Sequence, residues 1–354
     1  MKIGVLTKRY YTGKDLLKDR YGRLYHLPKA WAELGAEVDV IALDYRRGIP
    51  EEVTEGRLRL RSIPSSGFRL GQLEHEIRWD HYDVLVASGH LNLGRMVRSI
   101  AHKNQIPCLF DLYDYYPAFL GAFHCIGAIY MSHLLRAFNG IMVVSSALEV
   151  FCRLSNGAIC RVPNGVDRNL FQQIPQAQAR EELSIEANIP IFGLFGSISD
   201  DLGRLEVLEA FRDFRKQSPN AQLLVGGTGS SFFEGIEGAR SLGMLHQSDL
   251  PRWASACDCL LIPYRQSLQV RYSQSARLAE YLALGKPIVV TRTGDAESWF
   301  PANYSGWCEP ADSRSMLRAM ISQIENAEIL PFPEHLAWGA LGKTSSDFIH
   351  RRLD

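Results

Sequence analysis

Short runs of apolar and β-branched residues alternate with helical patterns along the chain, and this alternation constrains the fold more than any other feature. Each run is bounded by charge, Gly or Pro, as is typical of strands buried on both faces of a parallel sheet. Strands that alternate with helices predict βαβ units. We expect strands at Lys2–Thr7, Val38–Leu43, Asp83–Ala87, Ile106–Phe110, Ile141–Val144, Ile191–Phe195, Gln222–Val225, Cys259–Ile262 and Ile288–Val290.

The pattern divides into two similar halves. The join lies between Pro163 and Pro190, a stretch with prolines and a polar run. A length of 354 residues suits two domains of about 100–200 residues each. We therefore predict an α/β protein with two Rossmann-like domains that face each other across a cleft, over residues 1–165 and 185–330. We expect a last helix, within 335–354, to pack back on the first domain.

Composition excludes some partners. Lys+Arg and Asp+Glu both number 39, so no global field draws the chain to nucleic acid or to an anionic bilayer, and phosphate recognition must be local. The seven cysteines are odd in number and lie mostly in apolar runs, which is typical of reduced thiols. Their spacing predicts no metal site.

The longest apolar stretch is Phe119–Met131, which is shorter than the ~20 residues that span a bilayer. A core helix under a loop is favoured over a helix on a membrane surface or along an apolar acceptor site. The first residues do not read as a signal peptide. We expect a cytoplasmic protein, free or in peripheral contact with the inner membrane face.

One segment, Arg271–Val290, carries a specific chemical prediction. Ser273 or Ser275 can cap a helix that Gly285 ends. The free N–H groups at its start suit a diphosphate. Arg277 can add a cation, and Glu280, on the same face, can accept hydrogen bonds from ribose hydroxyls. A surface ion pair on an ordinary helix is the alternative.

This segment, Arg277-Leu-Ala-Glu-Tyr-Leu-Ala-Leu-Gly-Lys-Pro287, resembles the donor-binding helix of GT-B glycosyltransferases, especially glycosyltransferase family 4. Other stretches agree in order and spacing. They are Pro163–Asp167, Phe195–Phe211, Leu224–Gly229 and Gly243–Pro263. The resemblance covers nearly the whole second half and, more loosely, the first half.

The resemblance implies that a nucleotide-sugar donor binds mainly to the second domain and a saccharide, lipid-linked or small-molecule acceptor to the first. It also implies retention of anomeric configuration and no cofactor or metal, the nucleotide sugar being a co-substrate. The donor-binding residues that we expect are Gly196, Ser197, Arg204, Met244, Leu245, Tyr272, Ser273, Ser275, Arg277 and Glu280.

The chain departs from the family at three places. Relatives carry Arg and Lys where this chain has Ser197 and Leu202, and a first glutamate where it has Tyr272. The strand that ends near Phe110 is not followed by the usual His. We expect Arg204, Arg265, Arg271 or Arg277 to replace the cations, and Asp111, Asp114 or Tyr113 to orient the acceptor or the sugar. Capping of the next segment is the alternative for the two aspartates.

A charged loop after the first strand can contribute to the acceptor side. Gly13 and Gly22 allow close approach of a ligand, and Arg20 and Arg23 can meet an anionic acceptor such as a lipid diphosphate. A solvated loop is an equal alternative. We favour a glycosyltransferase that builds a bacterial-type polysaccharide or glycolipid. A nucleotide-sugar epimerase of the same fold and an inactive scaffold partner are the alternatives.

Overall fold

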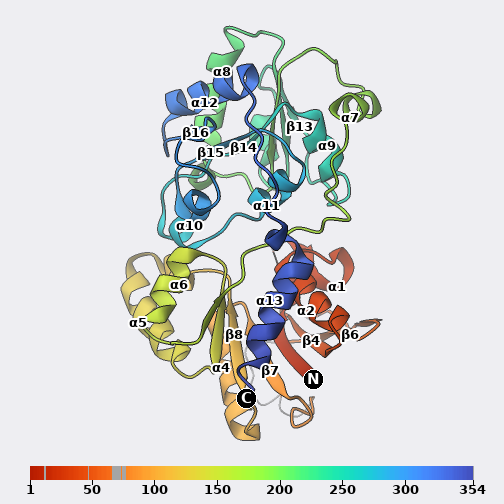
Figure 1. Cartoon of the computed structure of the whole chain (residues 1–354), viewed down its shortest axis with the longest axis vertical. Coiled ribbons are helices and arrows are strands. Elements are labelled where there is room, and N and C mark those ends of the chain that lie inside the picture. Colours follow the sequence, from red (N-terminus) through yellow and green to blue (C-terminus); the bar gives the residue numbers. More distant parts are fainter. Residues whose placement is uncertain (12, 47, 66–72, 74–76, 354) are drawn as a thin grey trace. The chain divides into compact units, whose positions relative to one another are not determined.

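The computed structural model describes residues 1–11, 13–46, 48–65, 73 and 77–353. The chain divides into two compact units (Figure 1). Unit 1 contains residues 1–165 together with 335–354, and unit 2 contains residues 166–334. Each unit is built on a largely parallel sheet, and each predicted strand is present to within two residues at either end.

The sheet of unit 1 has eight strands in the order β10-β9-β8-β7-β1-β4-β6-β5. All neighbours are parallel except the edge pair of β5 and β6. Strands β1, β7 and β8 are adjacent, so their carboxyl ends share one edge of the sheet. The strands are β1 (Lys2–Lys8), β4 (Glu37–Asp44), β5 (Glu52–Glu55), β6 (Leu58–Pro64), β7 (Val84–Ser88), β8 (Cys108–Leu112), β9 (Gly140–Val143) and β10 (Ile159–Arg161).

The helices of unit 1 connect these strands, and the C-terminal helix joins them. Trp31 Nε1 in α2 donates a hydrogen bond of 2.8 Å to the Ser345 hydroxyl in α13, and His26 stacks on Trp338. Figure 1 shows α13, in blue, beside α2. The elements are the hairpin β2 (Tyr10–Tyr11) and β3 (Lys14–Asp15), α1 (Leu16–Asp19), α2 (Arg23–Glu33), α4 (Leu91–Asn104), η1 (Tyr116–Phe123), α5 (His124–Leu135), α6 (Ser146–Arg153), η5 (Glu334–Leu336) and α13 (Trp338–His350).

The sheet of unit 2 has six parallel strands in the order β13-β12-β11-β14-β15-β16. Its core contains Phe192 from the sheet and Phe211 and Phe214 from α8. The strands are β11 (Ile191–Phe195), β12 (Gln222–Gly226), β13 (Ala239–Ser241), β14 (Cys259–Ile262), β15 (Ile288–Thr291) and β16 (Trp307–Cys308). The helices are α7 (Gln176–Glu182), η2 (Asp200–Leu202), α8 (Arg204–Arg215), η3 (Ser230–Phe233), α9 (Leu250–Ala256), α10 (Leu268–Tyr272), α11 (Ala276–Ala283), η4 (Gly294–Ser298) and α12 (Ser313–Glu325).

The apolar stretch near residue 120 is not the core helix that its composition favours. It forms η1 and α5, drawn in yellow in Figure 1, with a break at Gly121. Phe123 is 68% exposed and Ile129 is 72% exposed. By length and composition alone, residues Tyr116–Leu135 could cross a membrane. The sequence prediction failed because an apolar run does not show which of its sides is covered.

Candidate active site

The donor-side loop lies where β11 ends. Gly196 and Ser197 follow that strand directly, and both are exposed. Gly196 has a φ of +113°, and a Cβ built on it would lie 2.6 Å from Nε of Arg277. The backbone therefore packs directly against the Arg277 guanidinium, and a side chain larger than a hydrogen would displace it.

Arg277 is the buried cation of this loop. Its side chain is only 7% exposed, and its Nη2 donates a hydrogen bond to the Ser197 carbonyl oxygen. The guanidinium also lies 5.6 Å from the centroid of the Tyr264 ring. Nη1 has no hydrogen-bond partner among the described residues. An unpaired buried N–H is costly, so this group would gain free energy from an acceptor.

The helix expected over residues 273–284 begins later than predicted, and a short break separates α10 from α11. Ser275 occupies the N-cap position of α11, but its hydroxyl pairs with the Tyr264 hydroxyl at 2.8 Å and does not cap the helix. In the described part of the chain, the backbone N–H groups of Ala276 and Arg277 have no acceptor. Two free amides and a guanidinium thus occur together at the positive end of a helix, as phosphate binding requires.

A small recess lies beside the start of α11. Ser273 and Ser275 line it, together with Tyr264 and Asp295. The last residues of β14 and β15 also line it, so it lies at the carboxyl ends of these strands. The recess thus reaches Ser275, the N-cap residue of α11, whereas Ala276 and Arg277 are not among its lining residues.

The other basic candidates have other partners. Arg204 forms an ion pair with Asp200 at 2.7 Å and lies over the Phe232 ring. Arg265 Nε donates a hydrogen bond of 2.8 Å to Glu206. Arg271 is exposed and lies over Tyr272, which stands at the position of the family's first glutamate. Arg277 is thus the candidate cation that directly contacts the loop after β11.

The remaining donor-side residues lie around this loop or in α11. Glu280 is buried in α11, one turn after Arg277. Met244 is exposed after β13, and its Sδ accepts a hydrogen bond of 3.4 Å from the Thr228 hydroxyl. Leu245 packs over Gly226 at the end of β12. Met244 and Leu245 therefore offer apolar surface beside the carboxyl end of the sheet, where a nucleotide base could pack.

On the acceptor side, Asp111 has a structural role that differs from the expected catalytic one. It is buried at the end of β8, and Arg23 grips it with Nε and Nη2 at 2.6–3.0 Å. The Ser88 hydroxyl donates a further hydrogen bond of 2.7 Å. Arg23 Nη1 also donates to the carbonyl oxygens of Val162 and Pro163. Both Asp111 and Arg23 are thereby committed to the interior, and neither is available to an acceptor.

Asp114 differs from Asp111 in its surroundings. Burial raises its pKa to about 6, and the nearby Lys8 opposes this shift. Burial also lowers the pKa of Lys8, against the opposing charge of Asp114. His90 follows β7, and burial followed by the Lys8 charge lowers its pKa. Asp114 follows β8, Lys8 ends β1 and His90 follows β7, and these three strands are adjacent in the sheet. A pKa near neutrality, such as that of Asp114, suits a group that transfers protons.

Tyrosine side chains surround this group. The Tyr11 and Tyr113 rings meet edge to face at 5.4 Å, and the Tyr113 and Tyr116 rings lie 6.4 Å apart. His90 packs 5.0 Å from Tyr116. Burial raises the pKa of Tyr113 well above its usual value, followed by the influence of Tyr11 and Asp114. Tyr113 therefore keeps its proton and can act only as a neutral hydrogen-bonding group.

The loop residues that we expected on the acceptor side occupy turns. Gly13 lies in the turn between β2 and β3, with a φ of +81°. Arg20 ends α1 and forms an ion pair with Glu55 at 2.9 Å. Gly22 occupies the N-cap position of α2, with a φ of +68°. The structure thus gives these residues a local backbone role, and their contact with an acceptor stays a prediction.

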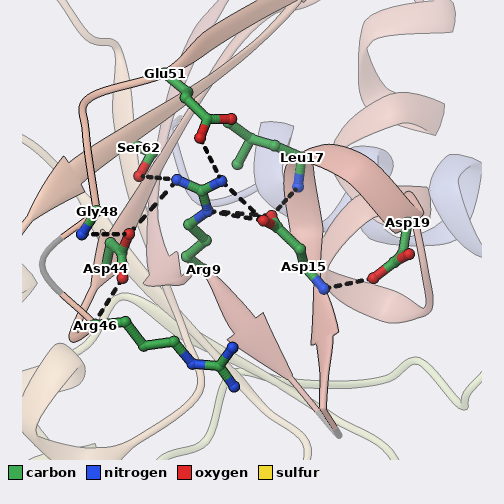
Figure 2. Close-up of polar contacts among 9 residues, drawn as sticks. All are labelled: Arg9, Asp15, Leu17, Asp19, Asp44, Arg46, Gly48, Glu51 and Ser62. Carbon is green, nitrogen blue, oxygen red and sulfur yellow. Dashed lines mark hydrogen bonds and ion pairs between the residues drawn. The ribbon is translucent and has the colours of Figure 1, made fainter.

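A buried network fixes this loop to the sheet (Figure 2). Arg9 follows β1 and is 2% exposed, and its Nη2 contacts Asp15 at 2.8 Å and Glu51 at 2.9 Å. Its Nη1 reaches Asp44 at 3.5 Å and the Ser62 hydroxyl at 3.1 Å. One guanidinium thereby connects the start of the loop to β4 and β6.

The sequence did not identify three members of these groups. Lys8 and Arg9 lie within or beside a predicted strand but carry no motif, and His90 reads as an ordinary structural histidine. Arg23 was expected to meet an anionic acceptor, whereas the structure pairs it with Asp111. The available signal was topological, because β1 and β7 were expected to end at the same sheet edge as β8. Among the described residues, no group of three or more His, Cys, Asp or Glu could hold a metal ion.

Comparisons with known proteins identify two glycosyltransferase domains in the chain. The family described as Glycosyltransferase Family 4 matches residues 23–170, and the family described as Glycosyl transferases group 1 matches residues 189–326. The chain is 24% identical, over 197 residues, to the lipopolysaccharide 1,2-N-acetylglucosaminetransferase of Salmonella typhimurium. This match spans 50% of the chain and about half of that curated relative (51%).

Solved structures share the fold over the whole chain. Sucrose-phosphate synthase from Thermosynechococcus elongatus has a TM-score of 0.74 at 15% identity, with 100% of this chain and 95% of that one covered. Anabaena HepE in complex with UDP-glucose has a TM-score of 0.70 at 15% identity, with coverage of 100% and 96%. The protein therefore belongs to the glycosyltransferases of the GT-B fold, with a family 4 domain followed by a group 1 domain.

Proposed function

We propose that this protein transfers a glycosyl group from a nucleoside diphosphate sugar to a saccharide or lipid-linked acceptor. One observation carries the proposal. The Arg277 Nη1 and the amides of Ala276 and Arg277 lack acceptors in the described chain and occur together at the start of α11. A diphosphate would accept hydrogen bonds from all three groups. The two positions at which relatives carry basic residues are Ser197 and Leu202 in this chain, so they supply no cation.

Unit 2 would bind the donor and stabilise the leaving diphosphate as the glycosidic bond breaks. Preorganised N–H groups and a buried cation do this efficiently, because they need no rearrangement during the reaction. Unit 1 would bind the acceptor, with ionised Asp114 accepting a hydrogen bond or the proton of the attacking hydroxyl. Asp111 is replaced in this role because Arg23 and Ser88 occupy its oxygens. We infer retention of anomeric configuration, as the family resemblance implies.

The donor that we propose is a UDP-hexose. HepE, which shares the fold, is described in complex with UDP-glucose, and the Salmonella relative transfers N-acetylglucosamine within lipopolysaccharide synthesis. Synthesis of a polysaccharide or glycolipid in the cytoplasm would fit both. All seven cysteines are free, which is typical of a reducing compartment. The proposal requires no cofactor other than the nucleotide sugar.

The test is calorimetric titration of the full chain with UDP and with uridine. Loss of one charge-assisted hydrogen bond costs about 1.5–3 kcal/mol, so Arg277→Gln should weaken UDP binding roughly 10- to 100-fold. Uridine affinity should stay the same, because uridine has no phosphate. Arg318→Gln, on the exposed face of α12, is the control. Equal losses for UDP and uridine would remove the phosphate role from Arg277.

Incubation with UDP-sugars, with and without acceptors, separates the remaining functions. UDP release that depends on an acceptor supports the transferase. A new sugar isomer without acceptor would identify an epimerase. Failure of UDP, GDP, ADP, CMP and dTDP to raise the melting temperature would indicate an inactive scaffold, because a ligand of the native state must stabilise it.

A further inference from the structure

The segment that follows the catalytic candidate Asp114 carries an exposed apolar face. We call it the α5 face. Phe123 is 68%, Ile126 66% and Ile129 72% exposed. Their neighbours add to the same surface of η1 and α5. The full set is Phe119, Leu120, Phe123, Ile126, Ile129 and Tyr130. Contiguous exposed apolar side chains of this size mark a surface that contacts a partner.

The opposite side of α5 is anchored to unit 1. Gly127, Met131, Leu134 and Leu135 are buried. The twelve residues of α5 are about 18 Å long, well short of the ~30 Å hydrocarbon core of a bilayer. Gly121, at φ +53°, separates α5 from η1, so the two do not form one straight rod. The segment can lie on a membrane surface, but it is not free to cross the membrane.

The elements around α5 carry more basic than acidic residues. Between Val84 and Leu148 the sequence has only two acidic residues, Asp111 and Asp114, and both lie at the sheet edge described above. In the same range, Arg95 and Arg98 are exposed on α4, which packs against α5, and Arg136 is exposed directly after α5. None of these arginines forms an ion pair with a described residue. Exposed arginines on α4 and directly after α5, together with an exposed apolar face, suit a bilayer of anionic lipids.

We propose that the α5 face docks on an anionic lipid bilayer, with the apolar side chains in the headgroup boundary and the arginines against lipid phosphates. The inference deepens the proposed function, on which its consequence for the substrate rests. η1 begins two residues after Asp114, so docking would hold this carboxylate close to the headgroups. The acceptor is then a lipid-linked saccharide that presents its hydroxyl at the bilayer surface.

Cosedimentation of the full chain with vesicles tests docking without any need for activity. We expect binding to vesicles of phosphatidylcholine and phosphatidylglycerol, weaker binding to phosphatidylcholine alone, and loss of binding as salt rises. Phe123→Ser with Ile129→Ser should weaken partitioning at least about tenfold, because each change removes an inserted apolar side chain. Ile329→Ser, an exposed apolar site in unit 2, is the matched control.

The charged border has its own test. Arg95→Gln with Arg98→Gln should reduce binding to the anionic vesicles and flatten its dependence on salt. Arg314→Gln with Arg318→Gln, an exposed pair on α12, should leave both unchanged. Cys125 is the exposed member of the seven cysteines and lies within α5, so a polarity-sensitive fluorophore on its thiol should shift to the blue when anionic vesicles are added.

Four outcomes would overturn the proposal. The first is unchanged vesicle binding in the Phe123→Ser, Ile129→Ser variant, and the second is a fluorophore spectrum that vesicles do not alter. The third is a wild-type dimer that the same variant converts to a monomer, because a second copy would then cover the α5 face. The fourth is a wild type that does not bind vesicles. UDP titration of the wild type separates the two hypotheses, because normal UDP affinity without vesicle binding refutes docking and leaves the proposed transfer intact.

Discussion

Replacement of Asp114 by Asn should stabilise the protein while it abolishes transfer. Burial raises the pKa of Asp114 to about 6 from an ordinary value of 3.8, with Lys8 as the opposing influence. Because the pKa of Asp114 is higher in the folded than in the unfolded state, the free energy of unfolding is highest below the unfolded pKa, where the carboxyl is protonated in both states. The free energy of unfolding falls as the pH rises from there to the folded pKa of about 6. Two pKa units correspond to about 3 kcal/mol, which is the cost of keeping this partly buried carboxylate ionised at pH 8.

The variant avoids this cost because Asn has nearly the same shape and stays neutral. Lys8 then loses its opposite charge, which offsets part of the gain. We expect Asp114→Asn to exceed the wild type in free energy of unfolding by about 2 kcal/mol at pH 8. The difference should shrink as the pH falls and vanish below about pH 3, where the wild-type carboxyl is protonated in both states. Wild-type kcat/KM should rise through an apparent pKa near 6.

Urea unfolding at several pH values between 4 and 8, followed by circular dichroism, measures the difference. Asp347→Asn, on the exposed side of α13 in the same unit, controls for the loss of one negative charge. A stability difference that does not depend on pH would refute the assigned burial cost. Full transferase activity in Asp114→Asn would refute the catalytic role, because the amide cannot accept a proton.

Three further predictions concern stability. Asp111→Asn should lower the free energy of unfolding by about 3 kcal/mol or more, because it leaves the buried Arg23 without its counter-ion, and thermal melting would measure the loss. Gly203→Ala should lower the melting temperature far more than Gly235→Ala. Both glycines have a positive φ, but a Cβ at Gly203 would lie 1.6 Å from the carbonyl oxygen of Pro263, whereas a Cβ at Gly235 would meet nothing within 4 Å. Arg9→Gln should cost roughly 3–5 kcal/mol by leaving buried carboxylates unpaired, and increased proteolysis of the 10–19 loop would report it.

Most of the fold could be predicted from the sequence because a strand that is buried on both faces has a continuous run of apolar residues. Strand β6 was missed because its leucines alternate with arginines, so only one of its faces is apolar. The break between α10 and α11 was missed for a different reason. Ser273 and Ser275 each read as caps, and the choice depends on a hydrogen bond to Tyr264, which is distant in the pattern.

The site was predicted unevenly because sequence identifies residue types but not their partners. Arg277 and Gly196 were named together from motif spacing, and their contact follows from the approach of α11 to the end of β11. Asp111 and Asp114 looked equivalent in sequence, three residues apart. Their roles differ because Arg23, 88 positions away, grips the first, whereas the second has only the weaker influence of Lys8. Such long-range partners are fixed by tertiary packing alone.

The loss of two basic residues from the loop after β11 can be compensated by one buried arginine. Ser197 and Leu202 remove two cations, yet Arg277 is buried against the same loop with an unsatisfied N–H. A buried guanidinium in a drier environment attracts a phosphate more strongly than an exposed lysine does, because water screens it less. One such cation with two helix amides can therefore replace a more exposed basic pair. The binding of UDP should then depend less on salt than an exposed pair would make it, and a steep loss of affinity between low and high salt would contradict this replacement.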